Sequence, residues 1–258
     1  MTAATQAIIL AAGRGSRMGE MTSTRPKCLT LLAGKPLLHW QLEALRLAGI
    51  QSITVIGGYR KDLLASESYQ LIDNPDWAST NMIATLRCAA DLLRQTPCLV
   101  TYSDIVYRPD RVKTLSEVDA DIAISYDTDW KALWIARFEN PLSDAETFRQ
   151  KDGWLIDIGR KPERISDVEG QYIGLIKLTP AGWVQVEQVL SSLSIDVQRR
   201  TDVTNLLRIL LDRGLRVRCV PGAGAWCEID DSADVDLYQR SLQESDRNAT
   251  RWHHDWRW

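Results

Sequence analysis

The segment Gln6-Ala-Ile-Ile-Leu-Ala-Ala-Gly-Arg-Gly-Ser-Arg-Met18 joins a short apolar run to a loop with two glycines. A short apolar run that ends at glycine predicts a buried strand. The glycines allow backbone N–H groups to approach phosphate oxygens, and Arg14 and Arg17 add positive charge. The spacing matches neither GxxxxGK[ST] nor GxGxxG, which excludes a typical P-loop or dinucleotide-binding loop. Taken alone, the loop is equally consistent with an ordinary turn between a strand and a helix.

Further apolar runs follow this segment at regular intervals. Residues 52–57, 98–104 and 120–127 have the length and composition of buried strands, and residues 69–73 predict a shorter one. Amphipathic helices are predicted after Pro36 and over residues 81–94, with Thr80 or Asn81 as the cap of the second. Alternation of strands and helices predicts an α/β fold, a Rossmann-like, mostly parallel sheet covered by helices. The strands lack polar alternation, as expected for a sheet that is buried on both faces.

The second half of the chain differs from the first in its pattern of residues. From residue 130, tryptophans stand among charged and turn residues, and three segments resemble strands, at residues 133–138, 153–159 and 170–178. We therefore expect a small antiparallel lid insertion at about residues 128–178 inside a single domain that spans residues 1–258. Helices are predicted over 180–192 and 202–213, followed by a late strand at 215–220 and a final helix. The tail could dock on the lid, dock on a second subunit, or lack order.

Composition limits the kinds of partner. The chain of 258 residues carries a formal net charge of −3, which argues against nucleic acid as the main partner. Its five cysteines are scattered without a CxxC pair, so they indicate reduced thiols rather than a disulfide framework or a zinc site. The sequence predicts neither a signal peptide nor a membrane span. We expect a soluble cytoplasmic protein, for which a homodimer is possible.

Two acidic residues follow predicted strands. Asp104 ends the run Cys98-Leu-Val-Thr-Tyr-Ser-Asp104, at the edge where open α/β sheets bind ligands. Asp230 lies in the late cluster Trp226-Cys-Glu-Ile-Asp-Asp231 and could supply a second carboxylate. Two carboxylates with phosphate oxygens and water suit Mg²⁺. The alternatives are that Asp104 closes a loop and that this cluster only caps a helix, a role that fits Asp231 or Ser232 better than Asp230.

The motif Leu10-Ala-Ala-Gly-Arg-Gly-Ser-Arg-Met18 followed by Pro26-Lys-Cys-Leu29 resembles the LAAGxGxRL…PKxL signature of the sugar-nucleotide and cytidylyl transferase superfamily, with Met18 where leucine is usual. The resemblance implies that Arg17 and Lys27 neutralise phosphates in the transition state and that Asp104 and Asp230 bind Mg²⁺. It also implies that the loop backbone holds the nucleotide, through Leu10, Ala11, Ala12, Gly13, Arg14 and Gly15.

A narrower resemblance concerns the substrates. The stretches 126–148 and Val168-Glu-Gly-Gln-Tyr-Ile-Gly-Leu175 are similar to the choline-phosphate and phosphonate cytidylyltransferase branch, and so is the helix start at residues 80–86. This resemblance implies nucleotide contacts from Asn81 and from the backbone at Gly58. Thr85, where serine would be expected, and Ser103 complete the candidate nucleotide-binding set.

Candidate acceptor-binding residues combine aromatic and charged side chains. Aromatic residues favour a quaternary ammonium through cation–π attraction, whereas carboxylates favour a primary amine, and an arginine could hold an anionic end. An ordinary core role is the alternative for each tryptophan. The candidates are Trp134, Arg137, Glu146, Glu169, Tyr172 and Trp226.

The sequence thus predicts a Mg²⁺-dependent enzyme that joins CMP from CTP to a small acceptor and releases pyrophosphate. The acceptor would be 2-aminoethylphosphonate, 2-hydroxyethylphosphonate or phosphocholine. One alternative is a sugar-1-phosphate nucleotidyltransferase, although the chain shows no hexapeptide repeats. An alternative of another class is a non-catalytic nucleotide-sensing domain.

Overall fold

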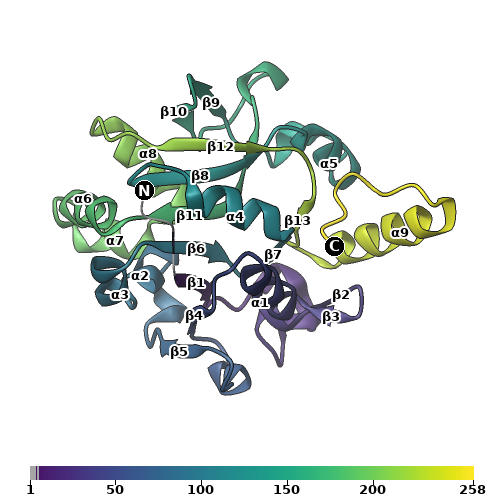
Figure 1. Cartoon of the computed structure of the whole chain (residues 1–258), viewed down its shortest axis with the longest axis horizontal. Coiled ribbons are helices and arrows are strands. Elements are labelled where there is room, and N and C mark those ends of the chain that lie inside the picture. The colour runs from purple at the N-terminus through teal and green to yellow at the C-terminus, as the bar shows by residue number, and fades with distance from the viewer. Residues whose placement is uncertain (1–3, 5) are drawn as a thin grey trace.

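The computed structural model describes residue 4 and residues 6–258. Its centre is a nine-stranded sheet with the order β5-β4-β1-β6-β11-β8-β12-β10-β9 (Figure 1). The strands are β1 (Gln6–Ala11), β4 (Ser52–Gly57), β5 (Gln70–Asp73), β6 (Cys98–Tyr102), β8 (Ile122–Asp127), β9 (Phe148–Lys151), β10 (Trp154–Ile158), β11 (Gln171–Leu178) and β12 (Arg218–Gly222). All except β10 and β11 run in one direction. The predicted α/β fold with a mostly parallel sheet is confirmed.

Helices cover both faces of this sheet. Successive residues of β1 point to opposite faces and so pack into two different hydrophobic cores. Ala7 and Ile9 pack into the core under α1 and α4. Ile8 and Leu10 pack into the core under α2, α6 and α8. Burial on both faces is why the strands are apolar throughout. The helices are α1 (Leu37–Leu47), α2 (Met82–Arg87), α3 (Ala90–Gln95), α4 (Pro109–Glu117), α5 (Trp130–Arg137), α6 (Pro180–Ser191), α7 (Ile195–Arg200), α8 (Val203–Asp212) and α9 (Ser232–Asn248).

Residues 133–138, predicted as a strand, instead belong mostly to helix α5, so that prediction was wrong. Trp130, Leu133 and Trp134 recur at helical spacing and are buried, while Lys131 and Ile135 face outward. A buried stripe with this spacing is the pattern of an amphipathic helix. The helix predicted over residues 81–94 is likewise divided, into α2 and α3.

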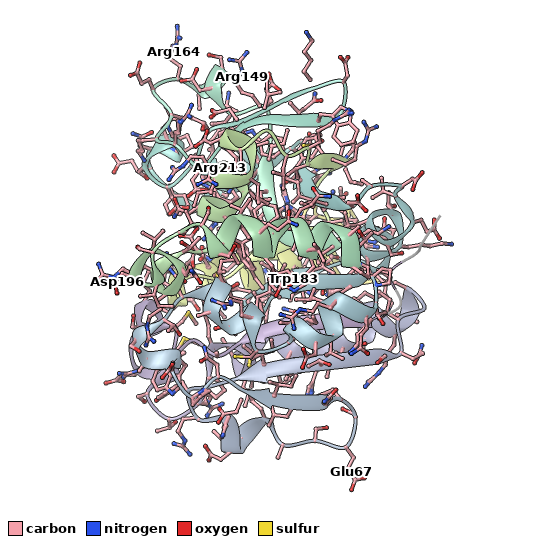
Figure 2. The ribbon with its side chains drawn as sticks, turned by 90° about the vertical axis from the view of Figure 1, so that its left-hand side faces the viewer. Glu67, Arg149, Arg164, Trp183, Asp196 and Arg213 are labelled. Carbon is pink, nitrogen blue, oxygen red and sulfur yellow. The ribbon has the colours of Figure 1, made fainter. Side chains whose placement is uncertain are left out.

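The segment predicted as the third lid strand, residues 170–178, is the central strand β11. It lies between β6 and β8 and is antiparallel to both. The predicted strand at residues 153–159 is β10, and it forms an antiparallel hairpin at one end of the sheet with β9, which was not predicted. In Figure 2 Arg149 and Arg164 mark this end, and Glu67 marks the opposite end of the molecule. The β9–β10 hairpin therefore extends the nine-stranded sheet beyond β12, to which β10 is paired.

A short ladder brings distant parts of the chain together. β7 (Ile105–Tyr107) follows β6 directly and pairs antiparallel with β13 (Trp226–Glu228). Asp231 then caps α9 by accepting hydrogen bonds from the backbone N–H groups of Ala233 and Asp234, as the sequence predicted for Asp231 or Ser232. Another small ladder joins β2 (Leu31–Leu32) to β3 (Lys35–Pro36). None of the described helices is long and apolar enough to cross a membrane.

The tail of the chain, residues 249–258, packs onto the same molecule. Trp256 is fully buried, and its ring meets that of Trp40 in α1 edge to face at 6.0 Å. His253 Nε2 lies 2.6 Å from Asp129 Oδ2, in the turn before α5. The tail thus contacts the segment predicted as the lid at Asp129, and it also packs against α1, which the sequence did not predict.

Candidate active site

Lys27 lies between two carboxylates at the edge of the sheet. Its Nζ is 2.8 Å from Asp104 Oδ2 and 3.2 Å from Asp230 Oδ1. Asp104 stands between β6 and β7, and Asp230 comes just after β13. The β7–β13 ladder explains their proximity, and the backbone N–H of Ile229 donates to the carbonyl of Asp104 at 2.9 Å. The fold thus gathers three residues to which the family resemblance assigns roles in the same chemistry.

These charges stabilise one another. Burial lowers the pKa of Lys27, but Asp104 and Asp230 outweigh burial, so the pKa is raised and the amine stays protonated. For Asp230, burial favours the neutral acid, yet Lys27, Arg17 and Arg137 together lower its pKa. Lys27 is only 7% exposed, so solvent screens these interactions weakly. The three groups form a charged, desolvated centre.

The glycine loop places Arg17 and Lys27 beside each other. Arg17 lies in the 3₁₀ helix η1 (Ser16–Thr22), and its Nη2 is 2.8 Å from Asp230 Oδ1. Gly15, just before this helix, has φ of 71°, and a Cβ there would stand 2.8 Å from side-chain carbons of Lys27. Glycine is therefore required at residue 15 both for the left-handed backbone and for the close approach of the lysine stem. Most of the Arg17 side chain remains exposed.

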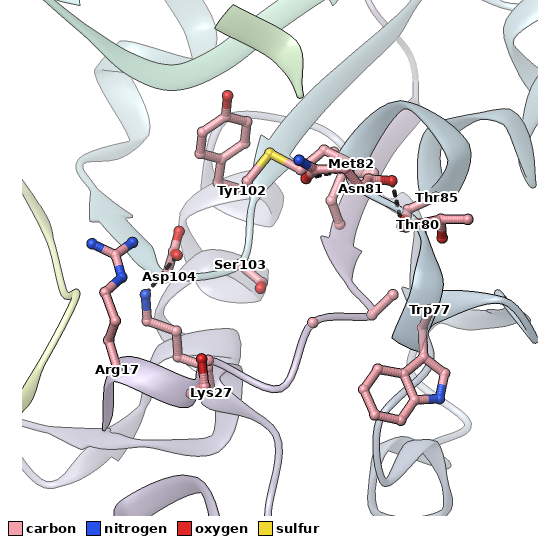
Figure 3. A pocket seen from close by; sticks show the side chains of 15 residues that line it. Arg17, Lys27, Trp77, Thr80, Asn81, Met82, Thr85, Tyr102, Ser103 and Asp104 are labelled. Atoms are coloured by element: carbon pink, nitrogen blue, oxygen red, sulfur yellow. Dashed lines mark hydrogen bonds and ion pairs between the residues drawn. The ribbon is translucent and has the colours of Figure 1, made fainter. Parts of the chain in front are cut away.

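A cavity of about 290 Å³ opens beside this centre (Figure 3). Arg17, Lys27 and Asp104 lie at one end of the view, and Trp77 and Thr80 lie at the other. The candidate nucleotide-binding residues that line it are Leu10, Ala12, Gly13, Gly15, Asn81, Thr85 and Ser103. Three others do not line it: Ala11, which is buried in β1, Arg14, whose guanidinium lies 5.6 Å from the centroid of the Tyr59 ring, and Gly58.

Trp77 is a wall residue that the sequence analysis missed. A Cβ on Gly58 would stand 2.5 Å from Cβ of Trp77 and 2.8 Å from the carbonyl oxygen of Ala12. Gly58 therefore lets Trp77 approach the first loop, and the Trp77 ring also meets that of Tyr59 at 5.3 Å. The glycine pair Gly57-Gly58 at the end of β4 was the available signal, because it marks a close approach of backbone.

Asn81 and Thr85 support the wall through their own hydrogen bonds. Asn81 Oδ1 accepts from the backbone N–H of Met82, which caps α2 as predicted, and its Nδ2 donates to the carbonyl of Arg200 at 3.1 Å. Thr85 Oγ1 accepts a hydrogen bond from buried Asn74 at 2.9 Å. These contacts tie the cavity wall to β5 and to α7.

A second cavity, of about 170 Å³, lies on the other side of Arg17 and Asp230. Four candidate acceptor-binding residues line it, namely Trp134, Glu146, Tyr172 and Trp226. The carboxylates of Asp144, Glu228 and Asp230 line it as well. Burial raises the pKa of Asp144 and of Glu146, and burial together with the neighbouring Asp230 raises that of Glu228. The cavity is rich in acid groups that a bound cation would stabilise in their charged form.

Two candidate acceptor-binding residues lie outside this lining. Arg137 has a fully buried side chain that pairs with Asp230 and Asp234. Glu169 Oε2 accepts a hydrogen bond from the backbone N–H of Gln150 at the edge of the β9–β10 hairpin. The fold therefore directs both side chains toward protein groups.

The two cavities meet at Arg17 and Tyr102, which line both. The remaining lining residues are separated by position in the sequence. Those of the larger cavity all lie within residues 10–104, whereas those of the smaller cavity, apart from the two shared residues, lie within residues 134–230.

The donor set at this junction fits a divalent cation. Asp104 Oδ1 is buried and has no hydrogen-bond partner among the described residues. Oxygens of Asp104 and Asp230 already converge on one positive charge, that of Lys27. Mg²⁺ uses one or two carboxylates and completes its shell with phosphate oxygens and water. Within the described part of the chain, no cluster of three or more acidic, histidine or cysteine ligands is present, so substrate oxygens would have to supply the rest.

Comparison with known proteins places these features in context. Residues 7–153 match the model of a family described as MobA-like NTP transferase domain. The CTP:phosphoglutamine cytidylyltransferase of Campylobacter jejuni is 34% identical over 247 residues, which are 90% of this chain and 98% of that protein. A 2-aminoethylphosphonate cytidylyltransferase of Lancefieldella rimae is 34% identical over 42% of this chain and 46% of its own. The inositol-1-phosphate CTP transferase from T. maritima shares the fold, with TM-score 0.74 and 18% identity over 92% of this chain and 96% of that chain.

Proposed function

Because this chain belongs to the MobA-like NTP transferases and, among them, to the cytidylyltransferases, we propose that it transfers CMP from CTP to a small acceptor with an anionic phosphonate or phosphate at one end and an ammonium group at the other. The observation that carries this proposal is the acidic cavity beside Lys27 and Arg17. Asp144, Glu146 and Glu228 line that cavity, and Arg17 stands at its border with the nucleotide cavity.

The chemistry requires no general base. An ionised acceptor oxygen attacks the α-phosphorus of CTP, an oxygen–phosphorus bond forms, and the bond from the α-phosphorus to the bridging oxygen breaks. The electron pair leaves with pyrophosphate. The protein must hold two anions together and neutralise the charge that develops, which is the work of preorganised cations. Arg17 lines both cavities and Lys27 lines the larger one, so both cations lie near the place where those anions would meet.

Asp104 and Asp230 would hold Mg²⁺ in this scheme. The ion would neutralise charge on the triphosphate and on the departing pyrophosphate. Lys27 is then free to turn from the carboxylates toward phosphate oxygens, since its partners receive another cation. Leu10, Gly13, Gly15, Ser103, Asn81 and Thr85 would surround the nucleotide, and Trp77 would close the far end of its cavity.

The acceptor's ammonium end is proposed to face the carboxylates of the smaller cavity. Charge-assisted hydrogen bonds to Glu146 and Asp144 would bind a primary amine. Trp134 and Trp226, whose ring centroids are 6.2 Å apart, form an apolar wall beside them. 2-Aminoethylphosphonate, phosphocholine and phosphoglutamine each carry an ammonium group and a phosphorus-bound anion. 2-Hydroxyethylphosphonate lacks the ammonium group and is expected to be a weaker acceptor.

A pyrophosphate-release screen tests the proposal. It crosses CTP, UTP, GTP and dTTP with these four acceptors and with sugar 1-phosphates, in the presence and absence of Mg²⁺. We expect release with CTP and an ammonium-bearing acceptor, dependent on Mg²⁺. Release only with sugar 1-phosphates would contradict the acceptor assignment. Nucleotide binding without release from any pair would favour a nucleotide sensor instead.

A further inference from the structure

Arg137 is a buried guanidinium with several acidic partners. It ends helix α5, and its Nε and Nη2 lie 2.8 and 2.9 Å from the two carboxylate oxygens of Asp234 in a bidentate pair. The rings of Trp134 and Phe138 each lie 4.9 Å from its Cζ. With no exposed side-chain surface, the guanidinium is committed to protein groups.

Both members of this pair contact Asp230. Asp234 Oδ2 accepts a hydrogen bond from the backbone N–H of Asp230 at 2.7 Å, and Arg137 Nη2 is 3.2 Å from Asp230 Oδ2. The other carboxylate oxygen of Asp230, Oδ1, faces Lys27 and Arg17. The two oxygens of Asp230 therefore have different neighbours, one pointing toward the buried pair and one toward the substrate junction.

We propose that Arg137 and Asp234 are positioning residues, which fix the backbone and the rotamer of Asp230 so that Oδ1 is presented to the metal and the nucleotide. This inference rests on the proposed function. The planar guanidinium pairs with Asp234 in a bidentate fork and still reaches Asp230, a geometry that the single ammonium of a lysine does not reproduce. Partners that orient a metal-binding carboxylate commonly change metal affinity by about 10- to 100-fold when they are replaced. Packing alone would not require this charge, because buried ion pairs are often replaceable by apolar residues.

The test measures metal binding without turnover. Mn²⁺ binding is followed by electron paramagnetic resonance with CTP present and acceptor absent, for wild type, Arg137→Lys and Asp234→Asn. Asp234→Asn keeps the shape of the side chain and an oxygen for the Asp230 N–H, so it guards against a variant that fails to fold. We expect the Mn²⁺ dissociation constant to rise at least about tenfold in both variants. The double variant should add little, because the two residues act as a unit.

Arg111→Lys is the matched control. Arg111 is also a buried arginine, but its guanidinium serves Gly224 and Tyr126 carbonyls and lies near Asp127. The Arg111→Lys substitution should lower the melting temperature and leave the Mn²⁺ affinity at the wild-type value. Unchanged Mn²⁺ affinity in Arg137→Lys and Asp234→Asn, with wild type binding the ion, would overturn the positioning role alone. Failure of wild type to bind Mn²⁺ with CTP would overturn the proposed metal site and this role with it.

Discussion

The ammonium of Lys27 lies 2.8 Å from a carboxylate oxygen of Asp104, although 77 positions separate the two residues in the chain. The contact joins the segment that follows the glycine loop to the residue between β6 and β7. In the proposed reaction, phosphate oxygens of the nucleotide would compete with these acidic side chains for Lys27. If Asp104 and Asp230 held Mg²⁺, their charge would be neutralised and the ammonium would be released.

Lys27→Ala removes the cation that faces the reacting phosphates. We expect kcat to fall at least about tenfold, because a preorganised charge at the transition state is lost. Circular dichroism should show the fold retained. Exposed Lys113 on α4 provides the matched control, Lys113→Ala, which should turn over at the wild-type rate. Wild-type kcat in Lys27→Ala would contradict the role of this residue.

Asp104→Asn keeps the size of the side chain and removes its charge. If Asp104 holds Mg²⁺, kcat should fall by at least about 100-fold at any metal concentration. A Mg²⁺ titration of pyrophosphate release measures the effect. Asp110 on α4 has an exposed side chain, and Asp110→Asn should leave the titration curve unchanged. Full activity of Asp104→Asn across that titration would exclude Asp104 as a metal ligand.

Glu146→Gln tests the ammonium end of the acceptor. The amide keeps the cavity shape but loses a charge-assisted hydrogen bond, so KM for 2-aminoethylphosphonate should rise by about tenfold. KM for 2-hydroxyethylphosphonate should change far less. The matched control is Glu163→Gln, which alters an exposed glutamate in the loop that follows β10. Equal changes in KM for both acceptors would show that Glu146 does not bind the ammonium group of the acceptor.

His254 predicts a pH dependence of stability. Burial lowers the pKa of this histidine, although Asp127 and Asp129 oppose that effect, while His253 adds to it. The unfolded chain, with an ordinary pKa near 6.5, then takes up the proton more readily, so the free energy of unfolding falls as pH drops below that value. Urea unfolding at about pH 5.5 and about pH 7.5 measures the difference, which cannot exceed about 1.4 kcal/mol per pH unit for one proton. His254→Gln should flatten it, and an unchanged pH dependence would contradict this assignment.

Trp256→Ala tests the docking of the tail. The indole is fully buried against Trp40, so its loss should lower the free energy of unfolding by about 3–5 kcal/mol. Trp258 also meets Trp40 but is 46% exposed, which makes Trp258→Ala the natural comparison with a smaller loss. Denaturant unfolding of both variants measures the contrast. Equal, small losses would mean that the tail does not stay docked in solution.

Local sequence patterns predicted the fold wherever a pattern had one structural outcome. The apolar runs of β1, β4, β6 and β8 and the caps Asn81 and Asp231 are examples. The order of strands was not accessible, because nothing local in residues 171–178 states that β11 enters between β6 and β8. Residues 133–138 resemble a strand between turn residues, but burial of one helical stripe makes most of them part of α5.

The candidate site was predictable to a similar extent. The glycine loop marked Lys27 and Arg17, and strand ends marked Asp104 and Asp230, all of which the structure brings together. Asp234 gave no local signal, since an aspartate in a first helical turn ordinarily serves the helix dipole. The sequence also did not indicate which groups the Arg137 side chain contacts. Only the packing of α5 beside α9 turns that guanidinium from the acceptor to Asp234 and Asp230.

The separation of the two cavities along the sequence has an evolutionary consequence. Every residue that lines the larger cavity precedes position 105, and those that line the smaller cavity, apart from Arg17 and Tyr102, follow position 133. If these cavities bind the nucleotide and the acceptor as proposed, mutation or recombination in the later half would alter acceptor binding and leave the nucleotide-binding residues unchanged. Arg17 and Tyr102 line both cavities. A gene that acquired a different second half would therefore need a new acceptor site that is compatible with these two side chains.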